Sequence, residues 1–167
     1  MSIVESLLSE YDREMATTRR VLERVPMDLA SWRPHEKSMT MGRLASHLAE
    51  IPEWAVKGCT LHEVDVAPAG APPPQRLTYG SGTELLAVLD GTATRGRAAI
   101  AGMTDAALLE PWTLKAGGTV VTTMPRLDVV RIWVLSHTIH HRGQLTVYLR
   151  LNGVPVPGIY GPSADER

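Results

Sequence analysis

Four long segments of the chain carry apolar residues at every third or fourth position, and this spacing constrains the fold more than any other feature. Such spacing puts the apolar side chains on one face of an α-helix. The helices that it predicts span residues 2–26, 40–59, 81–103 and 125–152. Because amphipathic helices readily bury their apolar faces against one another, the sequence predicts an all-α protein, an up-down-down-up four-helix bundle with long connections.

Local signals mark where these helices begin and bend. Ser2 with Glu5, and Ser81 with Glu84, have the spacing of a capping box, in which each side chain accepts the other residue's backbone N–H. Pro52 lies inside the second predicted helix and removes one backbone donor. We therefore expect a kink or a local tightening of that helix.

The connections between the predicted helices differ in character. Four prolines between residues 68 and 74 make that linker too proline-rich for regular structure, and its length allows the second and third helices to run parallel. Residues 104–123 predict a short helical turn and a small hairpin around Gly117 and Gly118. Because the chain has 167 residues and no internal repeat, we expect one domain, residues 1–167.

Composition limits the kinds of binding partner and the cellular compartment that we expect for this chain. The 17 lysines and arginines nearly balance the 18 acidic residues, so the chain lacks the basic footprint that nucleic-acid binding requires. No apolar stretch approaches membrane-spanning length. The single cysteine, Cys59, cannot form an intramolecular disulfide, and we interpret it as a small buried side chain rather than a nucleophile. These features predict a cytoplasmic protein with no nucleic-acid or membrane partner.

The fourth predicted helix holds the residues that point to chemistry. His137 and His141 are four positions apart, so their side chains project side by side from the helix. At about 100° per residue both fall near the centre of the apolar arc, and His140 falls at its edge. The arc is defined by Val130, Trp133, Val134, Leu145 and Tyr148.

Two inward imidazoles need partners, because burying an unsatisfied polar group costs about 1–3 kcal/mol. Each ring can hydrogen-bond to backbone or water as an ordinary polar core residue. A metal ion would satisfy both rings at once, and His47 lies beside Leu44 and Ile51 on the inner margin of the second helix, where it can complete a trio. Three histidines around one ion leave an open position for water or substrate. This interpretation makes His47, His137 and His141 ligands of a divalent metal ion.

Other motifs exclude particular metalloenzymes. A zinc peptidase of the helical type needs Glu directly after the first histidine of the pair, where this chain has Thr138. The chain also lacks the paired Glu-x-x-His units of a di-iron bundle. Glu50 and Glu53 lie near His47 and are interpreted as a solvated helix face, or as acceptors and general bases beside the site. Gln144 follows the second histidine by about one turn and is placed either to contact a metal-bound ligand or simply to pack.

Four segments of the chain form a specific combination: Trp32-Arg33-Pro34 with Ser38, residues 44–54, residues 137–144 and the tail 160–166. In this combination and order the chain resembles the DinB/YfiT-like family of small metal-binding proteins. The resemblance implies an up-down-down-up four-helix bundle, a homodimer, and zinc, nickel or a similar divalent ion. It also implies metal ligation by His47, His137 and His141, the trio that helical spacing selects.

The activities known in that family lead to three hypotheses. The first is a metal-dependent enzyme of the thiol S-transferase type, which acts on a small molecule with a low-molecular-weight thiol as partner. The second is a metal-dependent hydrolase in which Glu50 or Glu53 is the general base. The third is a non-catalytic metal-binding stress protein, in which His140 or Glu50 closes the site as a fourth ligand. The sequence identifies no catalytic residue.

Overall fold

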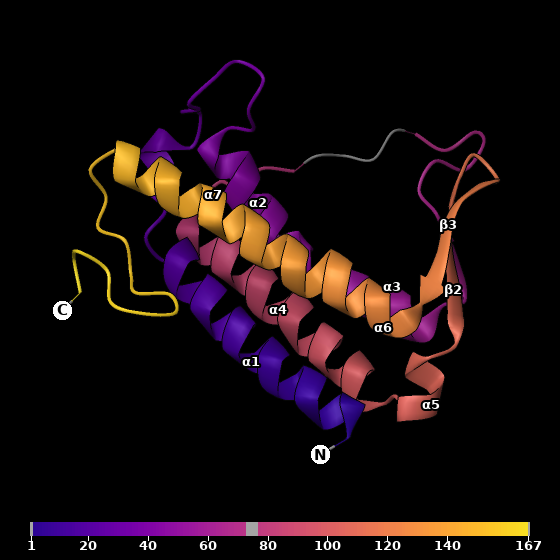
Figure 1. Ribbon diagram of the computed structural model, residues 1–167. Helices are drawn as coiled ribbons and strands as arrows, with labels where there is room; N and C mark the ends of the chain where they lie inside the picture. The colour runs from indigo at the N-terminus through magenta and orange to yellow at the C-terminus, as the bar shows by residue number, and fades with distance from the viewer. Residues whose placement is uncertain (1, 73–76, 167) are drawn as a thin grey trace.

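The computed structural model describes residues 2–72 and 77–166, and helices make up most of it (Figure 1). η1 is a 3₁₀ turn and η2 is a π-helix. The helical elements are α1 (Ile3–Leu22), η1 (Met27–Leu29), α2 (Met41–Glu50), α3 (Glu53–Thr60), α4 (Gly82–Ala101), α5 (Asp105–Leu108), α6 (Arg126–Asp128), η2 (Val129–Ser136) and α7 (His137–Leu151). None of the helices within the described ranges combines the length and the apolar character needed to span a bilayer.

The capping signals act as the sequence predicts at α1 and only in part at α4. At α1, the Ser2 hydroxyl accepts from the Glu5 N–H, and the Glu5 carboxylate accepts from the Ser2 N–H. At α4, the Ser81 hydroxyl accepts from the Glu84 N–H, but the Glu84 carboxylate accepts from the N–H of Gly80. The second capping box is therefore half formed, and Glu84 ties down the preceding loop instead.

Pro52 divides the second predicted helix into α2 and α3. It has no N–H to donate, and α2 ends at Glu50 while α3 begins at Glu53. The break places the Pro52 carbonyl against α4, where a Cβ added to Gly96 would lie 2.8 Å from that oxygen. Gly96 therefore permits a close approach between α4 and the junction of α2 with α3.

A three-stranded sheet stands beside one end of the helices (Figure 1). Its strands are β1 (Glu63–Asp65), β2 (Pro111–Ala116) and β3 (Thr119–Pro125), in the order β1-β2-β3. β1 runs parallel to β2, and β3 runs antiparallel to it. Gly117 and Gly118 form the turn between β2 and β3 with φ of 60° and 79°, so the predicted hairpin is confirmed.

The prediction of an all-α four-helix bundle is wrong, because the chain combines its helices with this mixed sheet. β1 lies in the linker that its prolines marked as irregular, and three residues are too few to show the alternation of a strand. Contacts distant in sequence hold β1 in place: the Asp65 carboxylate accepts from the N–H groups of Gly117 and Gly118 at 3.0 and 2.7 Å. Pro73 and Pro74 of the same linker lie outside the described residues.

The fourth predicted helix changes its pitch before it reaches the histidines. Residues 129–136 form η2, and α-helical geometry resumes at His137. A π-helical turn holds more residues than an α-helical one, so a count of 100° per residue across η2 gives the wrong rotation. Thr138 and Arg142, each 1% exposed, face the core, whereas His137 and His141 are half-buried. The prediction that these histidines occupy the centre of the buried face is wrong, and they lie at its margin.

Packing between the long helices sets the position of the site. α4 packs against α1, α2 and α3, while α7 packs against α1 and α2. Fully buried leucines join α2 to α7 through the core, among them Leu44, Leu48, Leu145 and Leu149. The two helices that carry the histidines are therefore neighbours.

Candidate functional site

α2 and α7 bring the three histidines together. His47 lies on α2, and His137 and His141 lie one turn apart on α7. The Nε2 atom of His137 is 3.2 Å from the Nε2 of His47 and 2.8 Å from the Nε2 of His141. One nitrogen from each ring lies within 4.8 Å of the other two. The trio that the sequence singled out thus converges on one point.

A hydrogen bond on the far side of the His141 ring determines where its proton lies. His141 Nδ1 is 2.7 Å from Gln144 Oε1, and because a carboxamide oxygen only accepts, Nδ1 carries the proton. The His137 ring also hydrogen-bonds to the backbone of Trp133, and its Nε2 faces the other two histidines. The Nε2 lone pair of His141 therefore points at the Nε2 of His137, 2.8 Å away.

The surroundings of the α7 histidines favour neutral rings. Burial lowers the pKa of His137, and the neighbouring His141 and His140 lower it further, against the opposing effect of the Trp133 hydrogen bond. Burial also lowers the pKa of His141, opposed by the Gln144 hydrogen bond and assisted by His140. The neutral imidazole is the form that ligates a metal ion.

The geometry of the trio fits a divalent ion. With metal–nitrogen bonds of about 2.0–2.1 Å, neighbouring ligand nitrogens in a tetrahedral or octahedral site lie about 2.8–3.4 Å apart. The contacts of 3.2 Å and 2.8 Å both fall in this range. An ion at this point would accept a lone pair from each of the converging nitrogens.

A fourth protein ligand is not found in the part of the chain that the structure describes. Among residues 2–72 and 77–166, the one group of three or more His, Cys, Asp or Glu side chains close enough to share an ion consists of the three histidines. His140 is exposed and packs edge-on against His141, with ring centroids 4.9 Å apart. An ion held by these three rings would keep coordination positions for water or another ligand.

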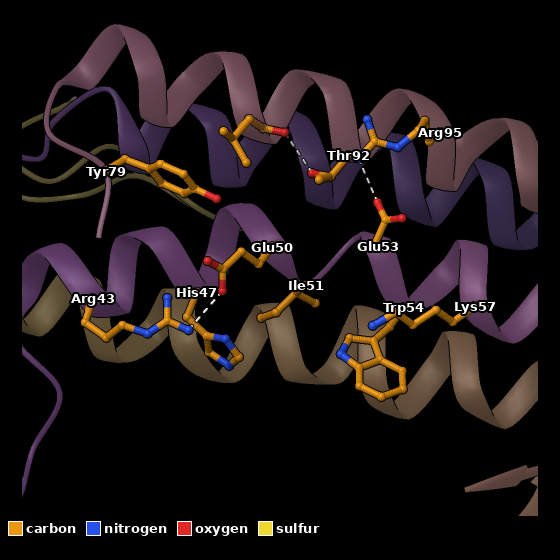
Figure 2. Close-up of a pocket in the computed structure, with 11 residues that line it drawn as sticks. Arg43, His47, Glu50, Ile51, Glu53, Trp54, Lys57, Tyr79, Thr92 and Arg95 are labelled. Carbon is orange, nitrogen blue, oxygen red and sulfur yellow. Dashed lines mark hydrogen bonds and ion pairs between the residues drawn. The ribbon is translucent and has the colours of Figure 1, made fainter. Parts of the chain in front are cut away.

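A cavity of about 530 Å³ opens beside His47 between α2, α3 and α4 (Figure 2). This volume lies within the range of small-molecule sites. Glu50 and Glu53 both line the cavity and are not simply solvated: Glu50 accepts from Arg43 at 2.9 Å, and Glu53 accepts from Arg95 at 2.8 Å. The two acids that the sequence placed near His47 thus share its cavity without joining the trio.

A smaller cavity of about 240 Å³ adjoins His137. Its other walls are apolar, formed by Trp54, Val66, Leu114 and Trp133. Trp54 also lines the larger cavity, so the two cavities have one wall residue in common. The larger, charged cavity reaches His47, and the smaller, apolar cavity reaches His137.

Sequence reasoning missed a buried ion pair behind the trio. Arg142, the residue after His141, donates to the Glu14 carboxylate of α1 at 2.6 Å, and their side chains are 1% and 7% exposed. The Tyr160 hydroxyl donates to the same carboxylate at 2.9 Å. The available signal is an acid beside Met15 in the apolar stripe of α1, which needs a cation if it is buried.

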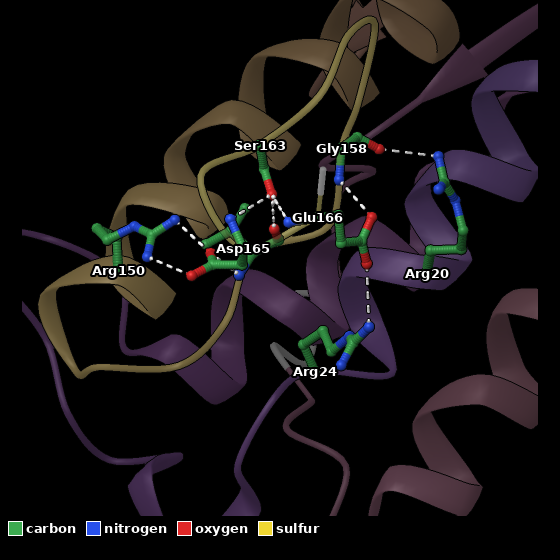
Figure 3. A network of polar contacts seen from close by, with 8 residues as sticks. Arg20, Arg24, Arg150, Gly158, Ser163, Asp165 and Glu166 are labelled. Atoms are coloured by element: carbon green, nitrogen blue, oxygen red, sulfur yellow. Dashed lines mark hydrogen bonds and ion pairs between the residues drawn. The ribbon is translucent and has the colours of Figure 1, made fainter.

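Tyr160 belongs to a C-terminal tail that surface ion pairs fasten to α1 and α7 (Figure 3). Arg24 of α1's C-terminal flank pairs with Glu166, and Arg150 of α7 pairs with Asp165. The Asp165 carboxylate also accepts from the N–H of Val156, which closes the tail into a loop. The tail therefore covers the helices on the side that holds the buried ion pair.

Cys59 behaves as the sequence predicts. Its side chain is buried in the core at 8% exposure. Burial raises the pKa of its thiol to about 11, although Arg126 acts in the opposite direction. A protonated and buried thiol is a poor nucleophile, so any thiol chemistry requires a second molecule.

The fold and the site define a small, mostly helical protein with a sheet at one end and a histidine trio that could hold one metal ion. The DinB superfamily profile matches residues 10–145, and the chain belongs to that family, as the sequence resemblance indicated. It is 51% identical over 35 residues to the uncharacterized protein YrdA of Bacillus subtilis, a match that spans 21% of either chain.

Two crystal structures share the fold. A DinB-like protein from Bacillus cereus superposes with a TM-score of 0.73 at 22% identity, covering 95% of this chain and 98% of that one. A DinB-like protein from Bacillus subtilis superposes with a TM-score of 0.67 at 19% identity, covering 97% of this chain and 99% of that one. Their likeness extends over nearly the full described chain and concerns the fold.

Proposed function

We propose that this chain is a divalent-metal-dependent enzyme that transfers a low-molecular-weight thiol to a small electrophilic molecule. The observation that carries the proposal is the convergence of His47, His137 and His141 beside a cavity large enough for a small molecule. Zinc or nickel suits the donor set, because imidazole is a favourable ligand for both.

An ion held by three imidazoles keeps an open position, where it would bind a thiol and lower its pKa so that it is a thiolate at neutral pH. The chain's own residues supply the geometry: Gln144 orients His141, and the Trp133 backbone orients His137. In the reaction the thiol loses its proton to solvent, and its sulfur forms a bond to an electrophilic carbon in the cavity. The leaving group departs with its bonding electrons.

The metal centre is tested first by elemental analysis of the purified full chain. We expect one divalent ion per chain in the wild type, and at least about tenfold lower occupancy in His47→Ala and in His141→Ala. His140→Ala is the matched control, since it removes an imidazole next to the trio and should keep its ion. Full occupancy in His47→Ala would show that α2 contributes no ligand.

The reaction is tested with the metal-loaded and the metal-free chain. Each is incubated with a thiol such as cysteine or glutathione and an aryl halide electrophile, and conjugate formation is followed by absorbance. We expect conjugation above background only with metal present. Equal rates with and without metal, for every pair tried, would contradict thiol transfer while leaving the metal result in place.

Hydrolysis is the second candidate, because Glu50 and Glu53 line the cavity together with His47. In that reaction one of the two carboxylates would take a proton from the attacking water. The test is a Glu50→Gln, Glu53→Gln double variant with activated esters as substrates. Hydrolysis that depends on metal but survives the double substitution would show that neither acid is the base.

Two further expectations come from the family. The chain is expected to form a homodimer, which light scattering would detect as twice the mass of one chain. A non-catalytic metal-binding role would require a fourth protein ligand, and a bound water or thiol on the ion in a metal-loaded structure would argue against it.

A further inference from the structure

Lys57 gives the cavity beside His47 an unbalanced positive charge. The two arginines in the lining are already paired with its two glutamates. Within residues 2–72 and 77–166, Lys57 forms no ion pair, and it instead lies over an indole ring. Three cations and two carboxylates leave one positive charge in the wall, and a divalent ion at the trio would add to it. A cavity lined by excess charge of one sign attracts a ligand of the opposite sign.

One contact of the Lys57 side chain and one of its backbone place this residue in the wall of the cavity. Its Nζ lies 4.5 Å from the centre of the Trp54 ring, a cation–π contact. The Trp112 indole N–H donates to the Lys57 carbonyl at 3.2 Å, which holds the backbone of the same residue. Figure 2 shows the amino end of Lys57 lying back over Trp54, toward Ile51 and His47. The charge therefore belongs to the cavity that His47 also lines.

Trp54 links this charged space to the apolar one. Its ring lines both cavities and packs edge-on against Trp133, with centroids 5.5 Å apart. In the smaller cavity, Val66 and Leu114 complete an apolar surface next to His137. A ligand that occupies both spaces would combine one anionic group with one apolar group, and its reacting atom would lie near the histidines.

We propose that the substrate is a small carboxylic acid with an aromatic or aliphatic group. Lys57 binds the carboxylate, and the apolar group packs against Trp54 and Trp133. Both arginines in this wall are paired with glutamates, so Lys57 is the one uncompensated cation there, and its single charge matches that of a carboxylate. That such an acid is a substrate, rather than only a ligand, rests on the proposed function, because the reaction would take place at the metal centre.

The experiment compares an acid with its neutral amide. Calorimetry measures the binding of 3-phenylpropionate and of 3-phenylpropanamide to the full chain, both metal-free and zinc-loaded. We expect the acid to bind about tenfold more tightly than the amide in both forms, because a charge-assisted hydrogen bond at Lys57 distinguishes them. Lys57→Met, which keeps the apolar stem over Trp54, should abolish that preference, and Lys37→Met, on an exposed loop, should keep it.

Each outcome separates the carboxylate site from the metal centre. Acid preference in the metal-free chain that disappears in Lys57→Met supports the carboxylate site even if no ion binds. Preference that appears only with zinc and survives Lys57→Met would mean that the carboxylate ligates the ion, and would overturn the proposal while leaving the proposed function intact. Equal binding of the two probes, or no binding of either, would also overturn it.

Discussion

Gln144 fixes the tautomer of His141: its Oε1 lies 2.7 Å from the His141 Nδ1, three residues earlier on α7. Because that oxygen can only accept, the proton stays on Nδ1 and the Nε2 lone pair points at the other two histidines. The sequence left Gln144 with two roles, contact with a metal-bound ligand or simple packing. The structure gives it another, which is to orient a member of the trio.

Replacing Gln144 should therefore weaken metal binding without removing a ligand. We expect Gln144→Ala to lower zinc affinity by about 10- to 100-fold, as is typical when the acceptor behind a ligating histidine is lost. Gln144→Glu keeps an acceptor at the same place and should retain the affinity. Competition with a chromophoric chelator measures both constants, and an unchanged affinity in Gln144→Ala would show that the hydrogen bond does not support ligation.

The lowered pKa values of His137 and His141 predict how the metal-free chain responds to acid. Below a pH of about 6.5 the unfolded chain binds protons on these histidines more readily than the folded chain does. The contribution of the neutral rings to the free energy of unfolding is therefore complete above the ordinary pKa of about 6.5 and is lost as the pH falls below it. The melting temperature should fall by a few degrees between about pH 7.5 and about pH 5.5. His141→Gln should reduce that fall. An identical fall in the variant would show that protonation of His141 does not cause the loss of stability in acid.

The features that the sequence predicted correctly depend on contacts a few residues apart. Ser2 caps α1 through a side chain that accepts an N–H three residues on, so the local sequence alone reveals this cap. The pairing of Glu63 with Thr113 in the sheet joins residues far apart in sequence, and no local pattern encodes it. The hairpin of β2 and β3 could therefore be predicted from its local turn, whereas β1 could not be predicted.

The histidines show the same division. Two residues four apart on a helix stay neighbours whatever the helix's rotation, so the pairing of His137 with His141 could be predicted from spacing. The face that is buried could not, because the π-helix η2 rotates α7 and turns Thr138 and Arg142 toward the core. The buried cation then requires the buried carboxylate of Glu14, a contact between helices at opposite ends of the chain.

Gly96 and Gly91 should respond in opposite directions to alanine. A Cβ on Gly96 would lie 2.5 Å from the Tyr11 hydroxyl and 2.8 Å from the Pro52 carbonyl, so Gly96→Ala should lower the free energy of unfolding by about 1–3 kcal/mol. A Cβ on Gly91 meets only the end of the Arg95 side chain at 3.5 Å, so Gly91→Ala should raise it by about 0.5–1 kcal/mol. Urea denaturation measures both. Stabilisation by Gly96→Ala would show that α4 does not approach Pro52 so closely.

The ion pair between Arg142 and Glu14 should behave as a buried pair rather than a surface one. Arg142→Met leaves the Glu14 carboxylate buried without its cation and should lower the free energy of unfolding by about 3–5 kcal/mol. The matched control is Arg150→Met, which breaks the half-exposed pair with Asp165 and should cost about 1 kcal/mol or less.

The double variant Arg142→Met, Glu14→Leu separates the charge from the packing in that pair. If the cost of Arg142→Met comes from an uncompensated carboxylate, removing the carboxylate as well should recover much of the lost stability, because two apolar side chains need no partner in the core. The Tyr160 hydroxyl loses its acceptor in the process, but its ring is 70% exposed, so water can satisfy it. A double variant as unstable as the sum of the two single substitutions, measured by the same urea denaturation, would mean that shape rather than charge holds α7 against α1.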